Sequence, residues 1–139
     1  MPGHNTTRHV EWADCDAAGI VFYPNYFRWM DGAFHAMTRS IGFDQQTLTD
    51  QYGVSGVPLV HAECDFRAPA HCHDDLLVAL AVTRLSQTTI SLSYTFSNGG
   101  EKIAEGFETR VFVRRGEDGV EKTAIPPEIR QRQEQLEER

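Results

Sequence analysis

Residues 11–31 read Glu-Trp-Ala-Asp-Cys-Asp-Ala-Ala-Gly-Ile-Val-Phe-Tyr-Pro-Asn-Tyr-Phe-Arg-Trp-Met-Asp. The carboxylate of Asp16 stands just before a turn of small residues, and an apolar run follows the turn. A helix is predicted to begin at Pro24, because the N–H that proline lacks has no partner at the first helical position. This order places a carboxylate beside a helix N-terminus, whose free amides and positive dipole end stabilise a developing negative charge. Both are components of a hydrolytic site.

The helix is predicted to run over 24–41, with Gly42 as its cap. Its apolar residues recur at steps of three and four, which is typical of one buried helix face. They are Tyr26, Met30, Ala33, Phe34, Met37 and Ile41. A second, short helix is predicted over 44–52.

Alternating apolar and polar residues predict strands in most of the remaining chain. The strands are expected at 9–12, 57–68, 76–82, 90–96 and 107–113. Asn98-Gly99-Gly100 is typical of a tight hairpin turn, because these residues tolerate positive φ. We therefore predict an α+β fold in which an antiparallel sheet, its last four strands joined by hairpins, curves around one long central helix.

The composition is that of an ordinary globular domain of 139 residues, 40% hydrophobic and 24% charged. We expect one domain over 1–139, with 1–7 and about 128–139 as peripheral tails. The net charge of −7 argues against nucleic-acid partners and against an anionic membrane surface. No apolar stretch approaches the roughly 20 residues of a membrane span, and we expect no signal peptide. With three cysteines interpreted as reduced thiols, this predicts a cytoplasmic protein.

Asp16 is the leading catalytic candidate, as the nucleophile or general base of acyl transfer. The carbonyl oxygen under attack would be held by the amide of Tyr23, since Pro24 has no N–H to donate. The alternative is that Asp16 or Asp14 only hydrogen-bonds the turn, as aspartate often does. Cys15 competes as a nucleophile, but a buried cysteine is usually inert and would face away from Asp16.

Other polar residues have less specific patterns. His61, Glu63 and Asp65 share one face of a strand, which favours a solvent-facing row, although His61 or Glu63 in a cleft would assist proton transfer. Asp31, on the helix, is either a solvated carboxylate or a contact for the polar end of a ligand. The run 71–75, His-Cys-His-Asp-Asp, lacks metal-site spacing and is predicted to be a polar hairpin turn with no metal. There is no glycine-rich cofactor motif, so no cofactor is expected.

Taken together, residues 14–26 and 28–31 resemble the signature of the hotdog-fold 4-hydroxybenzoyl-CoA thioesterase family. Shorter stretches at 56–60, 74–76 and 125–127 agree with this resemblance, which covers nearly the whole chain. It implies a sheet wrapped around one long helix, the fold that the pattern predicts independently. It also implies hydrolysis of an acyl-CoA thioester to the free acid and CoA, without metal or redox cofactor.

The resemblance implies roles for individual residues. Asp16 would attack the thioester carbonyl or activate water, and the Tyr23 amide, beside Pro24, would polarise the carbonyl oxygen. Asp31 would lie near the aryl end of the acyl pocket, and His61 is a candidate substrate contact. Members of the family form dimers, usually paired into tetramers, with sites at the subunit interface. A homotetramer is therefore expected.

This chain also departs from the family pattern. Ala17 replaces the proline that follows the catalytic aspartate. A basic cluster that some members direct at the CoA phosphates is replaced by polar residues at 86–88, so other arginines, such as Arg84, Arg114 or Arg115, would hold the nucleotide. Pro24 replaces the histidine of short-chain, Tol-Pal-associated thioesterases, which favours an aryl-CoA substrate.

Three alternatives stay open. One is a short-chain aliphatic acyl-CoA thioesterase of the Tol-Pal-associated type. Another is a hotdog hydratase, for which His35 lacks an evident acidic partner. The last is a non-catalytic acyl-CoA-binding module.

Overall fold

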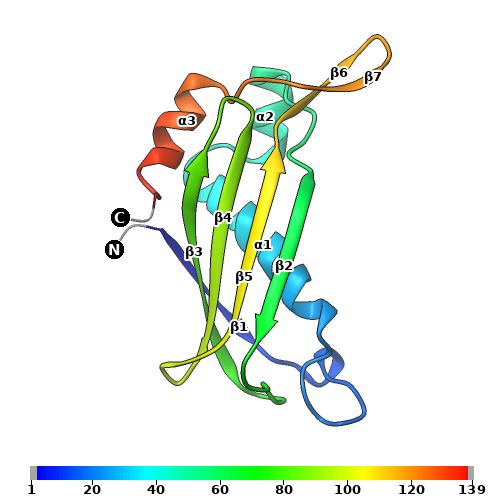
Figure 1. Ribbon diagram of the computed structural model, residues 1–139, viewed down its shortest axis with the longest axis vertical. Helices are drawn as coiled ribbons and strands as arrows, with labels where there is room; N and C mark the ends of the chain where they lie inside the picture. Colours follow the sequence, from blue (N-terminus) through cyan, green and yellow to red (C-terminus); the bar gives the residue numbers. More distant parts are fainter. Residues whose placement is uncertain (1–2, 138–139) are drawn as a thin grey trace.

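The computed structural model describes residues 3–137, in which one long helix lies across one face of an antiparallel sheet (Figure 1). The helical elements are η1 (Trp12–Asp14), α1 (Pro24–Ser40), α2 (Gln45–Tyr52) and α3 (Pro127–Glu134). The strands are β1 (His4–His9), β2 (Leu59–Phe66), β3 (Asp75–Leu85), β4 (Thr89–Asn98), β5 (Glu101–Val111), β6 (Val113–Gly116) and β7 (Gly119–Lys122). The predicted α+β class, a sheet around one central helix, is confirmed.

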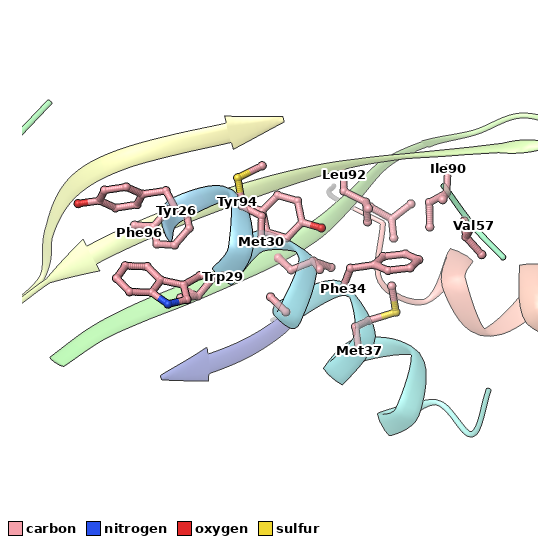
Figure 2. Close-up of a cluster of buried hydrophobic side chains, with 14 of the residues drawn as sticks. Tyr26, Trp29, Met30, Phe34, Met37, Val57, Ile90, Leu92, Tyr94 and Phe96 are labelled. Carbon is pink, nitrogen blue, oxygen red and sulfur yellow. The ribbon is translucent and has the colours of Figure 1, made fainter. Parts of the chain in front are cut away.

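Helix α1 begins and ends where its sequence signals predict. Pro24 occupies its first turn, and Gly42, at φ 90°, follows its end and donates its N–H to Arg39 O. The face toward the sheet is apolar and buried, as Figure 2 shows. It consists of Tyr26, Trp29, Met30, Ala33, Phe34 and Met37. Each large side chain buried in this way stabilises the fold by about 1.5–3 kcal/mol.

Strand β5 approaches α1 closely at Gly106. A Cβ at this position would lie 2.6 Å from the sulfur of Met30, which is fully buried. Only a glycine lets the thioether occupy this space, so Gly106 and Met30 together set how deeply the helix lies on the sheet. This depth matters because the polar residues farther along β5 reach the same helix.

The sheet order is β1-β3-β4-β5-β2, and all neighbouring strands pair antiparallel. The predicted hairpins β3–β4 and β4–β5 are confirmed, the second with Gly99 and Gly100 at positive φ. The hairpin predicted between the strands now labelled β2 and β3 is wrong, because these strands lie apart in the sheet. Residues 71–75 instead belong to a crossover, pinned where His73 N donates to Val10 O.

The two ends of the chain contribute more to the fold than predicted. The strand expected at 9–12 lies instead at His4–His9, pairing with β3, and η1 follows it. Residues 4–7, expected in a peripheral tail, are therefore part of the sheet. Near the other end, α3 buries Ile129 and Gln133. A short hairpin, β6–β7, was not predicted and projects beyond the sheet (Figure 1).

Candidate active site

The carboxylate of Asp16 stands in a tight turn that closes a short antiparallel ladder. Cys15 pairs with Val21, and Asp16 N donates to Ile20 O at 2.9 Å. Gly19 closes the turn by donating its N–H to Asp16 O at 3.0 Å, with φ 80°. This positive φ is a conformation that glycine adopts without steric cost.

The two oxygens of the Asp16 side chain have different surroundings. Oδ1 accepts the N–H of Ala18 at 2.9 Å, which fixes the side chain against its own turn. Oδ2 has no hydrogen-bond partner within residues 3–137, and the residue is exposed. Turn stabilisation and chemistry are therefore compatible, because one oxygen serves the turn while the other is open to a substrate.

Asp14 clamps this turn to the start of α1. Its buried carboxylate accepts Arg28 Nη2 at 2.7 Å and the N–H of Glu11 at 2.9 Å. Its carbonyl oxygen accepts Asn25 Nδ2 at 2.8 Å and the N–H of Phe22 at 2.9 Å. Because Asn25 and Arg28 belong to the first turns of α1, these bonds hold the Asp16 turn and the helix start as one unit.

Asp14→Asn is expected to loosen this unit. The Asp14 carboxylate accepts one hydrogen bond from Arg28 and one from Glu11. The NH₂ group of asparagine cannot accept, so one of these bonds would be lost and a buried polar group would be left unpaired, at a cost of about 1–3 kcal/mol. If the turn shifts by even about 1 Å relative to the helix, kcat falls roughly tenfold to a hundredfold. Urea unfolding and thioester turnover measure the two effects. A variant with normal stability and turnover would show that the clamp positions nothing.

The first turn of α1 presents an open amide next to an apolar hollow. Tyr23, which precedes Pro24, donates its N–H to no acceptor of the described chain, while its carbonyl accepts Tyr26 N at 3.1 Å. A hollow of about 380 Å³ opens beside it, with walls that include Tyr26, Phe66 and Ala70. Such an amide at a helix start suits an oxyanion. Asp16 does not line this hollow, which a single chain leaves open.

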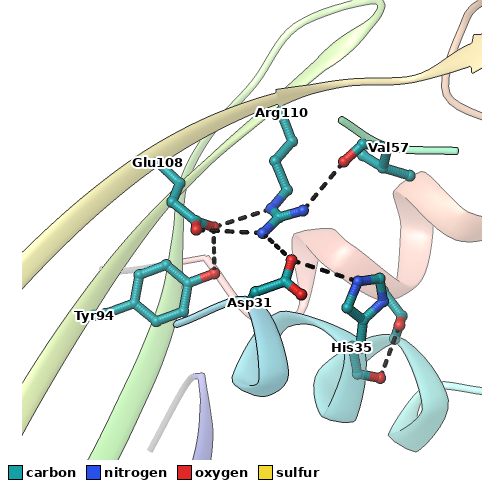
Figure 3. A network of polar contacts seen from close by, with 7 residues as sticks. Asp31, His35, Val57, Tyr94, Glu108 and Arg110 are labelled. Atoms are coloured by element: carbon teal, nitrogen blue, oxygen red, sulfur yellow. Dashed lines mark hydrogen bonds and ion pairs between the residues drawn. The ribbon is translucent and has the colours of Figure 1, made fainter. Parts of the chain in front are cut away.

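Asp31 is joined to a buried polar network that the sequence interpretation missed (Figure 3). Arg110 Nη2, from β5, donates to Asp31 Oδ1 at 2.8 Å and to Glu108 Oε2 at 3.2 Å. Arg110 also donates through Nε to Glu108 Oε1 and through Nη1 to the carbonyl of Val57. The hydroxyl of Tyr94 donates to Glu108 Oε1 at 2.7 Å.

The ion pair of Arg110 and Glu108 at the centre of this network is almost wholly buried. The side chains of Arg110 and Glu108 are 4% and 1% exposed, whereas that of Asp31 is 52% exposed. Burial acts to lower the pKa of Arg110, but hydrogen bonds to Glu108 and Asp31 outweigh it and raise that pKa above its ordinary value. Burial, followed by the nearby Glu108, raises the pKa of Tyr94 well above its ordinary value, so its hydroxyl remains a donor.

A signal for this network exists in the sequence. Alternation along β5 places Glu108 and Arg110 on the same face as Gly106, which is the face toward α1. Two charged residues at inward positions of an alternating strand indicate a buried ion pair. Their partner Asp31 lies 79 residues away in the chain, a pairing that only the fold reveals.

The structure places the two histidines that the sequence singles out, His61 and His35, in different surroundings. His61 pairs in register with Thr109, so it lies on the face of the sheet away from α1, exposed and 3.3 Å from Glu63. The structure therefore does not bring His61 to Asp31. Its exposed position agrees with the prediction that His61, Glu63 and Asp65 form a solvent-facing row. His35 does have an acidic partner, contrary to expectation, because its Nε2 lies 3.5 Å from Asp31 Oδ1 one turn earlier.

The environment of Cys15 disfavours a cysteine nucleophile. Its thiol lies 3.7 Å from the carbonyl of Glu11. Burial, Cys72 and Asp14 raise the pKa of the Cys15 thiol above its ordinary value. Because the thiolate is the reactive form, this environment lowers the reactivity of the side chain.

The chain is similar to known thioesterases in sequence and in fold. The family model described as the thioesterase-like superfamily matches residues 10–133. The 1,4-dihydroxy-2-naphthoyl-CoA hydrolase of Thermosynechococcus vestitus is 33% identical over 104 residues, which cover 74% of this chain and 70% of the relative. The solved structure of a gentisyl-coenzyme A thioesterase is 34% identical, with a TM-score of 0.80, and the match covers 93% and 98% of the two chains.

A third relative is the 4-hydroxybenzoyl-CoA thioesterase of Pseudomonas sp. strain CBS-3, 28% identical over 126 residues that cover 86% of this chain and 89% of the relative. Its solved structure superposes with a TM-score of 0.88 over 95% and 99% of the two chains. This likeness confirms the hotdog fold. Among the described residues, no helix combines the length and the apolar character that a membrane span requires.

Proposed function

This chain belongs to the thioesterase-like superfamily and is a thioester hydrolase, and from that premise we propose that it hydrolyses an aryl-CoA thioester to the free acid and CoA. The observation that carries the proposal is the Asp16 turn clamped to the start of α1. The relatives named for naphthoyl-, gentisyl- and hydroxybenzoyl-CoA support an aromatic acyl group.

Asp16 starts the reaction through its open oxygen. It either attacks the thioester carbonyl carbon, forming an anhydride that water then hydrolyses, or removes a proton from an attacking water. In both routes the carbonyl oxygen gains negative charge, which the N–H of Tyr23 and the α1 dipole stabilise. The C–S bond then breaks, the CoA thiolate leaves, and the acyl group becomes a carboxylic acid. Pro24 fixes the helix start without competing as a donor.

Asp31 receives the far end of the acyl group. It follows Tyr23 by eight residues, which is about 12 Å along the helix at 1.5 Å per residue. The acyl group would form one hydrogen bond to Tyr23 and one to Asp31, each about 2.8 Å long. Subtracting both bonds from this distance leaves roughly 6 Å, which matches the separation of a carbonyl oxygen and a hydroxyl oxygen on opposite sides of one aromatic ring. Asp31 Oδ1 is already bonded to Arg110, and its other oxygen is available for a ring hydroxyl.

A second copy of the chain completes the site. Strand β2 is an edge of the sheet, and an open edge lined by apolar side chains favours pairing with another chain. Exposed apolar residues gather there and at the helix start: Phe22, Tyr23, Leu59, Val60 and Phe66. Two of them, Tyr23 and Phe66, also line the open hollow. We expect a homodimer across β2, paired into a tetramer, and light scattering of the purified protein measures this state.

Arginines outside the buried network are available for the CoA phosphates. Arg84 and Arg115 are exposed, whereas Arg114 is paired with Glu121 at 2.8 Å. Residues 86–88 form the β3–β4 turn through Ser86 and supply no cation. Arg84 and Arg115 are therefore the stronger candidates.

A substrate panel tests the proposed function. Thiol release is measured with benzoyl-, 4-hydroxybenzoyl-, gentisyl-, phenylacetyl- and butyryl-CoA, and kcat/KM is expected to be highest for a hydroxylated aryl ester. Preference for butyryl-CoA would refute the aryl assignment while leaving a thioesterase. Because His35 lies beside Asp31, hydration of crotonyl-CoA is measured in parallel. Hydration without any thiol release would refute the hydrolase, and tight aryl-CoA binding without turnover would identify a binding module.

A further inference from the structure

Two histidines meet where β1 ends and the crossover 71–75 enters β3. His9 is the last residue of β1 and pairs in register with Asp75, the first residue of β3. His73 belongs to the crossover, and its Nδ1 lies 3.5 Å from Nε2 of His9. The ring centroids are 5.6 Å apart, farther than these two nitrogens, so the nitrogens face each other. Both residues are exposed, so the point between them is open to solvent.

The separation of the two nitrogens suits a shared metal ion better than a hydrogen bond. A hydrogen bond that an N–H group donates is usually about 3 Å long. Two imidazole nitrogens that each lie about 2.1 Å from one tetrahedral ion are roughly 3.4 Å apart. The observed distance of 3.5 Å is close to the second value, so an ion fits between His9 and His73 with little movement of either ring.

Asp75 holds His9 in the form that binds a metal. Its Oδ1 lies 2.7 Å from Nδ1 of His9. Because an ionised carboxylate only accepts hydrogen bonds, Nδ1 of His9 carries the proton, and Nε2 of the neutral ring keeps its lone pair toward His73. A carboxylate behind a metal-binding histidine orients the ring and raises its basicity. The supporting group of a metal site is therefore already in place.

His73 has an unusual backbone conformation. In the part of the chain that the structure describes, it is the one residue other than glycine with a positive φ, at 72°. Its N–H donates to the carbonyl of Val10 at 2.8 Å, which ties the crossover to the end of β1. Glycine adopts such a φ without the steric cost that a side chain brings. A histidine at a position that favours glycine indicates that the imidazole itself is needed.

We propose that His9 and His73 bind one divalent transition-metal ion of the Zn²⁺ or Ni²⁺ class, with Asp75 positioning His9. Imidazole suits these ions, whereas Mg²⁺ and Ca²⁺ prefer oxygen ligands. Among residues 3–137, no three histidine, cysteine, aspartate or glutamate side chains surround a common metal position. The ion therefore has two protein ligands and completes its coordination with water. Spacing within 71–75 gives no sign of this site, because His9 lies 64 residues from His73.

The bound ion joins two segments that support the Asp16 turn. His9 ends the strand that leads into this turn, and the crossover pairs with the turn through His71 and Ile20. An ion that binds the folded chain and not the unfolded chain raises its stability. The proposed thioester hydrolysis does not use the ion, so the metal site goes beyond that function and its failure leaves that function intact.

Calorimetric titration of the untagged, chelator-treated full chain with ZnCl₂ tests the site. We expect one Zn²⁺ per chain with a Kd in the micromolar range, a Tm raised by about 3–8 °C at saturating Zn²⁺, and no binding of MgCl₂. His73→Gly is expected to weaken Zn²⁺ binding by about 100-fold or more, since losing a ligand costs at least as much as losing its supporting group. Its metal-free Tm is unchanged or higher, because glycine adopts the same φ.

Two further variants separate the supporting carboxylate from a general effect of removing histidine. Asp75→Asn is expected to weaken Zn²⁺ binding about tenfold, with a smaller change in the metal-free Tm. His61→Ala is the matched control, because His61 is also exposed and lies 3.3 Å from a carboxylate, that of Glu63. This variant is expected to bind Zn²⁺ as the wild type does.

NMR of the histidine side chains gives a measurement on the unmodified protein. Zn²⁺ is expected to shift the imidazole signals of His9 and His73 and to leave those of His61 in place. A folded His73→Gly variant with wild-type Zn²⁺ affinity would overturn the site, as would a wild-type chain that binds no Zn²⁺. Half an ion per chain would show an ion that bridges two copies, which contradicts a site within one chain.

Discussion

Asp16→Asn is expected to lower kcat for an aryl-CoA ester by roughly 10³-fold or more, with KM changed less than about threefold. Asparagine has nearly the same shape, and its carbonyl oxygen can still accept the N–H of Ala18, so the turn is preserved. What the substitution removes is the negative charge of the open oxygen. The loss therefore falls on the chemical step and spares binding, which steady-state kinetics with released thiol measures.

The control for this variant is Asp118→Asn, which changes an exposed carboxylate in the β6–β7 turn. It carries the same charge change outside the Asp16 turn and is expected to leave kcat unchanged. Near-normal turnover by Asp16→Asn would rule out nucleophile and general base alike. A large rise in KM at constant kcat would instead give Asp16 a binding role.

Arg110→Met is expected to lower the free energy of unfolding by about 3–5 kcal/mol. Removing the guanidinium leaves the carboxylate of Glu108, whose side chain is 1% exposed, with Tyr94 as its remaining partner. An uncompensated buried charge costs far more than the packing lost with the side chain. Urea unfolding measures the effect, and a loss below about 1 kcal/mol would contradict the assignment of a buried, charged Glu108.

The double variant Arg110→Met, Glu108→Leu distinguishes charge from packing. Both charges leave together, and apolar residues of similar volume often replace a buried pair with little loss of stability. It is therefore expected to be more stable than Arg110→Met alone, although it releases Asp31 from its anchor. Additive losses would show that the two side chains act independently.

The sequence is sufficient to predict the helix and much of the sheet, because their signals are local. In α1, a periodic apolar stripe, a proline at the start and a glycine after the end all agree. The edge strands are harder to predict. Residues of β1 are polar, so this strand lacks the alternation of a half-buried strand and is displaced from the predicted 9–12. Strand β2 lies within the predicted strand at 57–68, but nearly all of its residues are exposed, so its place at the sheet edge does not follow from the sequence. The pairing of β2 with β5 also departs from the expectation that consecutive strands are neighbours.

The residues of the candidate site also differ in how far the sequence alone predicts their placement. Asp16, Tyr23 and Pro24 lie within one short stretch of sequence, and the bonds that Asp14 makes to Asn25 and Arg28 tie the Asp16 turn to the start of α1. The anchor of Asp31 depends on strand register, which brings Arg110 under the helix, and spacing along the chain contains no trace of this pairing. The placement of His61 on the opposite face of the sheet is likewise a matter of register.

The most direct test of the whole account is a crystal structure of the Asp16→Asn variant with uncleaved 4-hydroxybenzoyl-CoA. We predict a thioester carbonyl oxygen about 3 Å from the amide nitrogen of Tyr23, with the side chain of residue 16 against the carbonyl carbon. A thioester bound away from the first turn of α1, with that side chain directed into bulk solvent, would contradict the proposed catalytic site.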